Sequence, residues 1–331
     1  MHTGRLLVAF AALAAAGWAQ SSAGVNGPVT GFIFDMQAGA IRPMLGIPGA
    51  AYLGNATVAG LAAAAVSPDG SAALAVQNGK LFVYNGLRTT ALAVSAVGGA
   101  IAKPSYFAWA DNNIAAIYAP ASAQGQILSG LTAAPAAGAP IDLAGLPGPV
   151  TALAFDGQRL ILAVTSSESG GIYLASVAAG TERIAVAANP SALTVAGSSL
   201  YFADSQAQQI FQVQNYARTP SVVPFANDSG IASPSGLQIS ADGRRLYVAN
   251  AGSRKLAVYD IASRSPEQTV DLSFTPTRLD RFGDSSVFLM NGIGQGPFYV
   301  ARDGGAGKAA VYFVPAQPGK PRRPRDPIRP M

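Results

Sequence analysis

One sequence pattern recurs at a near-constant spacing along most of the chain. Residues 236–260, GLQISADGRRLYVANAGSRKLAVYD, alternate apolar and polar side chains on both sides of Asp242-Gly243. This period of two predicts β-strands, and Asp-Gly predicts the two-residue turn of a hairpin. Related turns occur at Asp69, Asp111, Asp156, Gly197 and Asp284. Asp69 and Asp284 lie 215 residues apart over five intervals, so the mean repeat is 43 residues.

Prolines mark the same repeat independently. One precedes the first strand of each of five units, at steps of 45, 41, 44 and 42 residues: Pro104, Pro149, Pro190, Pro234 and Pro276. Proline at the start of a strand removes no hydrogen bond from the ladder, so these positions predict entry into an inner strand. The Pro-, Ala- and Gly-rich stretch from Leu131 to Pro149 predicts a long connection between two units.

A repeat of about 40 residues with four short strands is typical of a β-propeller. We therefore predict an all-β fold, a single propeller of four-stranded antiparallel blades, with six complete repeats in residues 56–314. Residues 20–55 include GPVTGFIFDMQAGAIRPML, which predicts a hairpin. This segment would either complete a seventh blade or pair at the ring closure, so the sequence leaves six and seven blades open.

Two stretches resemble known propeller repeats. YVANAGSRKLAVYDIAS, residues 247–263, resembles the YVTN family of bacterial extracytoplasmic propellers, and LYFADSQAQQIFQV, residues 200–213, is similar to an NHL repeat. The resemblance covers most of residues 56–314. It implies the fold but no single activity, because such propellers include binding modules, lyases, lactonases and scaffolds.

The first 19 residues predict export. Arg5 is followed by an apolar run from Leu6 to Gly17 and by small residues at Gly17 and Ala19. This is the pattern of a signal peptide cleaved after Ala19, and the run is too short to cross a bilayer. Every later apolar run is broken by turn residues, so no transmembrane segment is predicted. We expect a secreted or periplasmic protein.

The formal charge of +5 is concentrated at the two ends of the chain. Arg5 belongs to the predicted signal peptide. The tail, residues 315–331, carries a net charge of four from Lys320, Arg322, Arg323, Arg325 and Arg329 against Asp326. The remaining body is neutral, so no nucleic-acid partner is expected.

Proline occupies every third position of the tail from Pro315 to Pro330. A polyproline II helix has three residues per turn, so the prolines would align along one edge. The tail's Lys320, Arg322, Arg323, Arg325 and Arg329 are therefore the predicted partner-binding residues. They would dock on an acidic surface of a protein or a cell-envelope polymer, and the alternative is a solubilising tail without a partner.

Chemistry that depends on histidine or cysteine is excluded from the body. The only histidine is His2, and the chain has no cysteine. This removes Ser-His-Asp and Cys-His catalysis and metal sites built from histidine or thiolate. Asp69, Asp156 and Asp242 lie in the repeated turns and are expected to form them.

Polar residues near the ends of second strands form the candidate binding site of the sequence. They are Asn78, Asp204, Asn250 and Asn291, which would converge on one rim of the central channel. Their oxygens would suit Ca²⁺, although such residues also satisfy loop backbone groups. No catalytic residue and no other cofactor are predicted. The leading hypothesis is a monomeric, non-enzymatic binding or scaffold module that uses its loop face and channel rim. The alternative is a carboxylate- and metal-dependent lactonase-like hydrolase.

Overall fold

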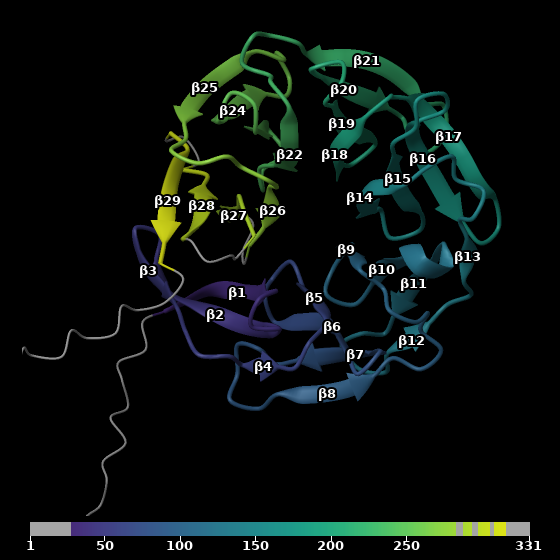
Figure 1. Cartoon of the computed structure of the whole chain (residues 1–331), viewed down its shortest axis with the longest axis vertical. Coiled ribbons are helices and arrows are strands. Elements are labelled where there is room, and N and C mark those ends of the chain that lie inside the picture. The colour runs from purple at the N-terminus through teal and green to yellow at the C-terminus, as the bar shows by residue number, and fades with distance from the viewer. Residues whose placement is uncertain (1–27, 283–286, 293–296, 305–307, 316–331) are drawn as a thin grey trace, which may run out of the picture.

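The chain folds into a β-propeller of seven antiparallel blades around a central axis (Figure 1). The structure is a computed structural model that describes residues 28–282, 287–292, 297–304 and 308–315. The predicted fold class is confirmed, and the number of blades is seven. The predicted signal peptide, the turn at Asp284 and the tail from residue 316 onward lie outside the described residues. In the part of the chain that the structure describes, no helix is long and apolar enough to span a membrane.

The blades are numbered 1 to 7 in chain order. Blade 1 contains β1 (Val29–Asp35), β2 (Ala40–Ile47), β3 (Ala50–Leu53) and β4 (Val58–Ala59). Blade 2 contains β5 (Ala63–Val66), β6 (Ala72–Gln77), β7 (Lys80–Asn85) and β8 (Ala93–Ala96). Blade 3 contains β9 (Tyr106–Trp109), β10 (Ala115–Ala119), the short 3-10 helix η1 (Pro120–Ser122), β11 (Gln124–Ser129), β12 (Ala136–Ala137) and β13 (Ile141–Asp142).

Blades 4 to 7 repeat the same order. Blade 4 contains β14 (Val150–Phe155), β15 (Leu160–Val164), β16 (Gly171–Ser176) and β17 (Gly180–Val186). Blade 5 contains β18 (Pro190–Ala196), β19 (Ser199–Asp204), β20 (Gln209–Gln214) and β21 (Ser221–Ala226). Blade 6 contains β22 (Pro234–Ile239), β23 (Arg245–Asn250), β24 (Lys255–Asp260) and β25 (Pro266–Asp271). Blade 7 contains β26 (Asp280–Arg281), β27 (Val287–Leu289), β28 (Phe298–Arg302) and β29 (Ala310–Val314). The first strand of each blade lies nearest the axis (Figure 1).

The N-terminal segment completes a blade with its own strands. β1, β2 and β3 pair in sequence, and β4 pairs with β2. The first sheet therefore extends to Ala59, beyond the boundary at residue 55 that the sequence suggested. Among the described strands, every blade is one continuous stretch of chain, so no strand is shared between blades 1 and 7.

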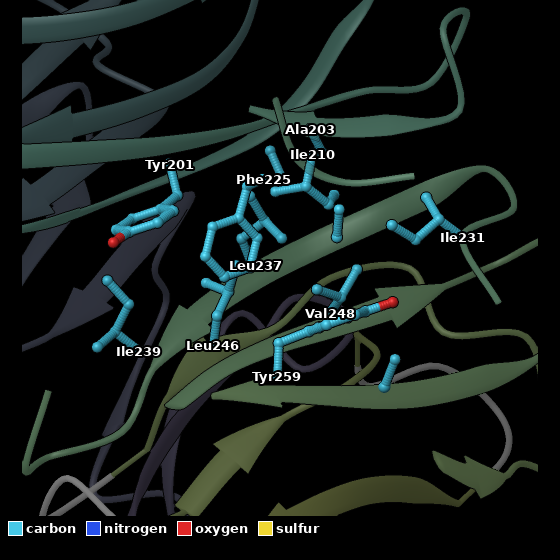
Figure 2. Close-up of a cluster of buried hydrophobic side chains, with 13 residues drawn as sticks. Tyr201, Ala203, Ile210, Phe225, Ile231, Leu237, Ile239, Leu246, Val248 and Tyr259 are labelled. Carbon is cyan, nitrogen blue, oxygen red and sulfur yellow. The ribbon is translucent and has the colours of Figure 1, made fainter. Parts of the chain in front are cut away.

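Side-chain packing between neighbouring blades forms the core. Seven clusters of buried apolar residues occur among the described residues, and each is shared by two adjacent blades. Figure 2 shows the cluster between blades 5 and 6, which includes Leu237 and Val248. The rings of Tyr201 and Phe225 pack edge to face there, with their centroids 5.3 Å apart. A buried side chain of this size contributes roughly 1.5–3 kcal/mol. The cluster between blades 7 and 1, which includes Phe282 and Ile33, closes the ring.

The Asp242-Gly243 loop forms a hairpin, but not by the predicted two-residue turn. In the loop after β22, the Ser240 N–H donates to the carbonyl of Arg245 at 2.9 Å, and the Gly243 N–H donates to the carbonyl of Ser240 at 3.0 Å. Gly243 has a φ of 70°, whereas Asp242 is not among the residues with positive φ. The Asp242 carboxylate instead accepts from the Arg244 N–H at 3.1 Å. Aspartate thus acts through its side chain, and glycine alone takes the left-handed conformation.

The segment predicted as a long loop after Leu131 contains the outer edge of blade 3. β12 and β13 pair with opposite ends of β11. Between these two pairings, the buried Gln126 side chain accepts from the Ile101 N–H at 2.8 Å and donates to the carbonyls of Gly99 at 3.0 Å and Gly138 at 2.7 Å. A single glutamine therefore joins the split outer edge of blade 3 to the connection at residues 99–101.

Candidate functional site

Two of the predicted rim residues bind the chain that connects their blade to the preceding one. Asp204 ends β19, and its carboxylate accepts from the backbone N–H groups of Gln206 at 2.9 Å, Ala207 at 3.1 Å and Ala188 at 3.0 Å. Asn250 ends β23 and is fully buried, and its Oδ1 accepts from the Ala232 N–H at 3.2 Å. Both side chains hold an interblade connection in place.

The other two rim residues lie in hairpin loops. The Asn291 Oδ1 accepts from the Tyr299 N–H at 2.8 Å, and its amide donates to the carbonyl of Pro297 at 3.3 Å. Asn78 is exposed, with a φ of 51°, in the turn between β6 and β7. Among the described residues, no hydrogen bond joins any two of the four rim positions. The structure places them one strand outward from the axis, where the oxygens of three of them already accept backbone N–H groups.

The described side chains do not form a cluster of metal ligands. In residues 28–282 and the three later described ranges, no group of three or more His, Cys, Asp or Glu side chains could hold an ion. The Asp204 carboxylate is already shared by three N–H donors, which leaves it little capacity for a cation. The rim residues therefore do not fit Ca²⁺ well.

Hydrogen bonds that the sequence did not suggest join the inner strands of four consecutive interfaces. The donors are the hydroxyls of Tyr106, Thr151, Ser191 and Ser235, and the acceptors are the carbonyls of Val150, Pro190, Pro234 and Pro276, at 2.9, 2.5, 2.5 and 2.9 Å. Each acceptor lies at or before the start of the next inner strand. The prolines that marked the repeat therefore also supply carbonyls that connect blades 4 to 7 near the axis.

A repeated β-bulge places three of these four hydroxyl groups. The register between the first and second strands shifts at Thr151, Ser191 and Ser235, and also at Thr30 of blade 1. A bulged residue is left unpaired and its side chain is re-aimed. The pattern of a hydroxyl residue directly after the strand-opening residue was the available sequence signal. Its meaning depends on the neighbouring blade, which a single repeat does not reveal.

Charged side chains occur on the innermost strand of blade 7. Arg278 precedes β26, and Asp280 and Arg281 form it. The Arg278 Nε lies 3.0 Å from Asp280 Oδ2, and the Arg281 Nη2 donates to the carbonyl of Ile239 on β22 at 2.7 Å. These three residues are named the axial charge cluster. Leu279, between them, is buried in the core shared with blade 6.

The axial charge cluster is both accessible and surrounded by protein. The Asp280 side chain is 54% exposed, and Arg281 is also exposed. β26 contacts β22, the inner strand of blade 6. Desolvation by this protein wall raises the pKa of Asp280, an effect that the Arg278 charge partly offsets. The same desolvation lowers the pKa of Arg281.

Charge is rare on the other inner strands. β5, β9, β14, β18 and β22 contain no charged residue, and the Asp35 carboxylate at the end of β1 pairs with Arg42 at 3.0 Å. The sequence signal for the axial charge cluster was present in TRLDRF, residues 277–282, as two arginines and an aspartate on a predicted inner strand. It was not recognised, because charged side chains are ordinarily assigned to solvated edges.

Comparison with solved structures supports the propeller fold. A protein described as a "putative 6-phosphogluconolactonase" from Bacteroides uniformis is 14% identical and covers 87% of this chain and 97% of its own, with a TM-score of 0.63. A protein from Bacteroides fragilis with the same description is 13% identical and covers 87% and 96%, with a TM-score of 0.60. A chain of a nidogen/laminin complex is 14% identical and covers 74% and 98%, with a TM-score of 0.52. At these identities the likeness establishes the fold alone.

Sequence comparisons give no closer assignment. No family model matches the chain, and the search of curated proteins found no relative. The resemblance to YVTN and NHL repeats therefore stays a prediction.

Proposed function

We propose that this protein is a non-enzymatic binding propeller that takes a ligand at its axis and a macromolecular partner on its loop face. One observation carries the proposal. Charge on the described inner strands is concentrated in the axial charge cluster, in which Asp280 and Arg281 are exposed. Clefts with low-dielectric walls focus the field of such charges on a ligand.

The placement of the carboxylates supports binding over catalysis. In the described ranges, every aspartate has a hydrogen-bond or ion-pair partner, and Glu267 pairs with Arg245. The partners of the aspartates are mostly arginines or backbone N–H groups of turns. The other two glutamates, Glu168 and Glu182, are exposed. General acid–base chemistry needs a carboxyl group positioned against substrate, and the body has neither histidine nor cysteine to replace one.

Lactone hydrolysis is the alternative that the experiment must address, because two of the similar structures carry a lactonase description. The purified mature protein is incubated with a panel of lactones, with and without divalent metal and chelator. The expected result is hydrolysis no faster than in buffer. Hydrolysis that requires metal and is lost with chelator would overturn the proposal.

The location and the tail form a second part of the proposal. The protein is exported as a YVTN/NHL-type propeller, is monomeric, and uses the cationic tail to dock on an acidic protein or envelope polymer. A truncation after Ala316 is expected to keep the melting temperature of the full chain. Only the full-length protein should be retained by envelope fractions at low salt and released as salt rises. Equal fractionation of the two forms would remove the role of the tail.

Calcium binding at the predicted rim has a direct test. A bound ion would raise the melting temperature as Ca²⁺ is added, and Asp204→Ala would abolish that rise. An unchanged melting temperature in the wild type would exclude the site.

A further inference from the structure

β1 has one edge without a strand partner. In the first sheet β1 pairs with β2, and both β3 and β4 also pair with β2, so the four strands occupy only three positions across the sheet. β1 is therefore an end strand, and its other edge pairs with no strand among the described residues. The backbone N–H and C=O groups along such an edge are a template for one more strand.

The hydrogen bonds of Asp35 show which strand of a blade β1 corresponds to. Asp35 ends β1, and its Oδ1 accepts from the N–H groups of Gln37 and Ala38, both at 3.1 Å. Asp204, at the end of the second strand of blade 5, accepts from the residues two and three positions later in the same way. β1 also contacts β5 of the next blade, as the second strands β10, β15 and β19 contact the inner strands β14, β18 and β22.

The loop after β1 gives the same orientation. The Leu61 N–H, just before the inner strand β5, donates to the carbonyl of Gly39 in this loop at 2.9 Å. In blades 5 and 6, the Ser233 N–H, just before the inner strand β22, donates to the Gln208 side chain in the loop after the second strand β19, at 2.6 Å. β1 therefore has the position of a second strand. Its free edge faces the axis, which β5, β9, β14, β18, β22 and β26 surround in the other six blades (Figure 1).

The residues that directly precede β1 contain the sequence signal of a hairpin. Asn26-Gly27 lies outside the described residues, and Gly27 comes two residues before Val29, where β1 begins. The glycines of the Asp-Gly loops come two or three residues before β6, β15 and β23, and their φ angles are 72°, 92° and 70°: Gly70, Gly157 and Gly243. Asn-Gly and Asp-Gly are turn signals of the same class, so residues before Asn26 are placed to return along β1.

Residues 20–25, QSSAGV, have the composition of an inner strand of this protein. They are uncharged and mostly small, as β5 (AAAV) is, and no charged residue occurs in β5, β9, β14, β18 or β22. Six residues is also the length of β14 and β22. The C-terminal tail is a poor candidate, because every third residue is a proline without an N–H group and because it follows the outer strand β29.

We propose that residues 20–25 add to the axial edge of β1 as an antiparallel strand and form the inner strand of blade 1. Asn26-Gly27 makes the turn, with Gly27 in the left-handed conformation. The inference goes beyond the proposed function and takes from it only the cleavage after Ala19. The start of the mature chain then forms the axial side of blade 1, so that any ligand at the axis meets the processed N-terminus.

The strand geometry fixes the direction of each mutational effect. Successive residues of an end strand direct their N–H groups alternately toward the neighbouring strand and away from it. Of Ser22→Pro and Ala23→Pro, one therefore removes a ladder hydrogen bond and should melt roughly 2–4 °C below the other. Gly27→Val should also lower the melting temperature, because a β-branched residue is strained at positive φ. Gly145→Val is the control, since Gly145 has no atom within 4 Å of a new Cβ and no positive φ.

The experiment is hydrogen exchange followed by mass spectrometry on two chains, one that starts at Gln20 and one that starts at Asn26. In the shorter chain, the amides of β1 (Val29–Asp35) should exchange about tenfold faster or more, because the protecting strand is missing. The amides of β22 and β23 in blade 6 should exchange equally in both chains. Both chains are made without residues 1–19, so the result does not depend on export.

Three results would overturn the proposal. They are equal exchange of β1 in the two chains, melting temperatures of both proline variants equal to that of the wild type, and protection of β1 that rises with protein concentration, which would indicate a second copy at the edge. If the shorter chain does not fold, the proline pair and Gly27→Val give the same test. No ligand or hydrolytic activity enters these measurements, so their failure would leave the proposed binding function standing.

Discussion

Gly236 determines how closely the inner strands of blades 6 and 7 approach each other. A Cβ atom at this position would lie 2.4 Å from the Leu279 nitrogen, 2.7 Å from the Arg278 carbonyl carbon and 2.7 Å from the Leu279 Cβ. Two of these three are backbone atoms, and that backbone is fixed because the N–H groups of Thr277 and Arg278 donate to the carbonyl of Met290. Gly236→Ala must therefore push the two strands apart.

The loss in the free energy of unfolding follows from the rigidity of this backbone. Overpacking a core costs about 1–3 kcal/mol, and backbone neighbours that cannot rotate away place Gly236→Ala at the upper end, about 3 kcal/mol. In a large domain, 1 kcal/mol shifts the melting temperature by roughly 2–4 °C, so we expect a loss of about 6–12 °C.

The assay is thermal unfolding followed by circular dichroism, with two comparison variants. Gly145→Ala has no atom within 4 Å of the new Cβ and should melt as the wild type does, or slightly higher. Gly31→Ala meets only the Phe282 ring, at 2.9 Å, and should lose less than Gly236→Ala, because a ring can tilt. A Gly236→Ala melting temperature within about 1 °C of the wild type would refute the argument.

Three further predictions concern side-chain hydrogen bonds. Ser235→Ala removes the 2.9 Å bond to the carbonyl of Pro276 and should lower the free energy of unfolding by about 1 kcal/mol in urea, whereas Ser235→Thr should restore it; equal losses in both would contradict this role. Burial, followed by the charge of Asp156, raises the pKa of the Tyr216 hydroxyl to about 12. The neutral hydroxyl therefore contributes fully to the free energy of unfolding below about pH 10, and this contribution is lost as the pH rises toward 12. Tyr216→Phe should therefore flatten the loss of stability above about pH 10, and an unchanged pH profile would exclude this contribution. Gln126→Leu leaves the buried Ile101 N–H unpaired, along with the carbonyls of the exposed Gly99 and Gly138, and should cost about 1–2 kcal/mol in the same urea assay; a midpoint equal to that of the wild type would disprove the bridging role.

The propeller architecture was predictable because the strands and turns of each blade follow from the local sequence pattern. Alternation and the turn at Asp242-Gly243 predicted a strand on each side of the turn, and these strands are β22, Pro234–Ile239, and β23, Arg245–Asn250. The number of blades was not predictable, because the choice between a seventh blade and a shared strand depends on how residues 28–59 meet residues 280–314. No local pattern encodes that contact.

The site was harder to predict than the fold, for a physical reason. An asparagine or aspartate at a strand end has the same sequence signature whether it binds a ligand or a loop backbone, and Asp204 and Asn250 bind backbone. The hydroxyls of Ser191 and Ser235 look like ordinary turn residues until the adjacent blade supplies an acceptor. The axial charge cluster could have been found from sequence alone by asking which inner strand carries charge.

The seam between blades 1 and 7 has a consequence for how the protein is made. Blade 1 is synthesised first, and its face with Ile33, Met44 and Leu53 has no partner until residues 280–314 have been translated. A chain that stops before blade 7 would be an open arc with an uncovered apolar face at each end, because Leu256 and Leu272 of blade 6 would also lose their cover. Such surfaces are prone to aggregation and degradation. Residues 280–314 therefore decide whether the ring closes, and a chain that stops before blade 7 is more exposed to degradation than one in which the ring is closed.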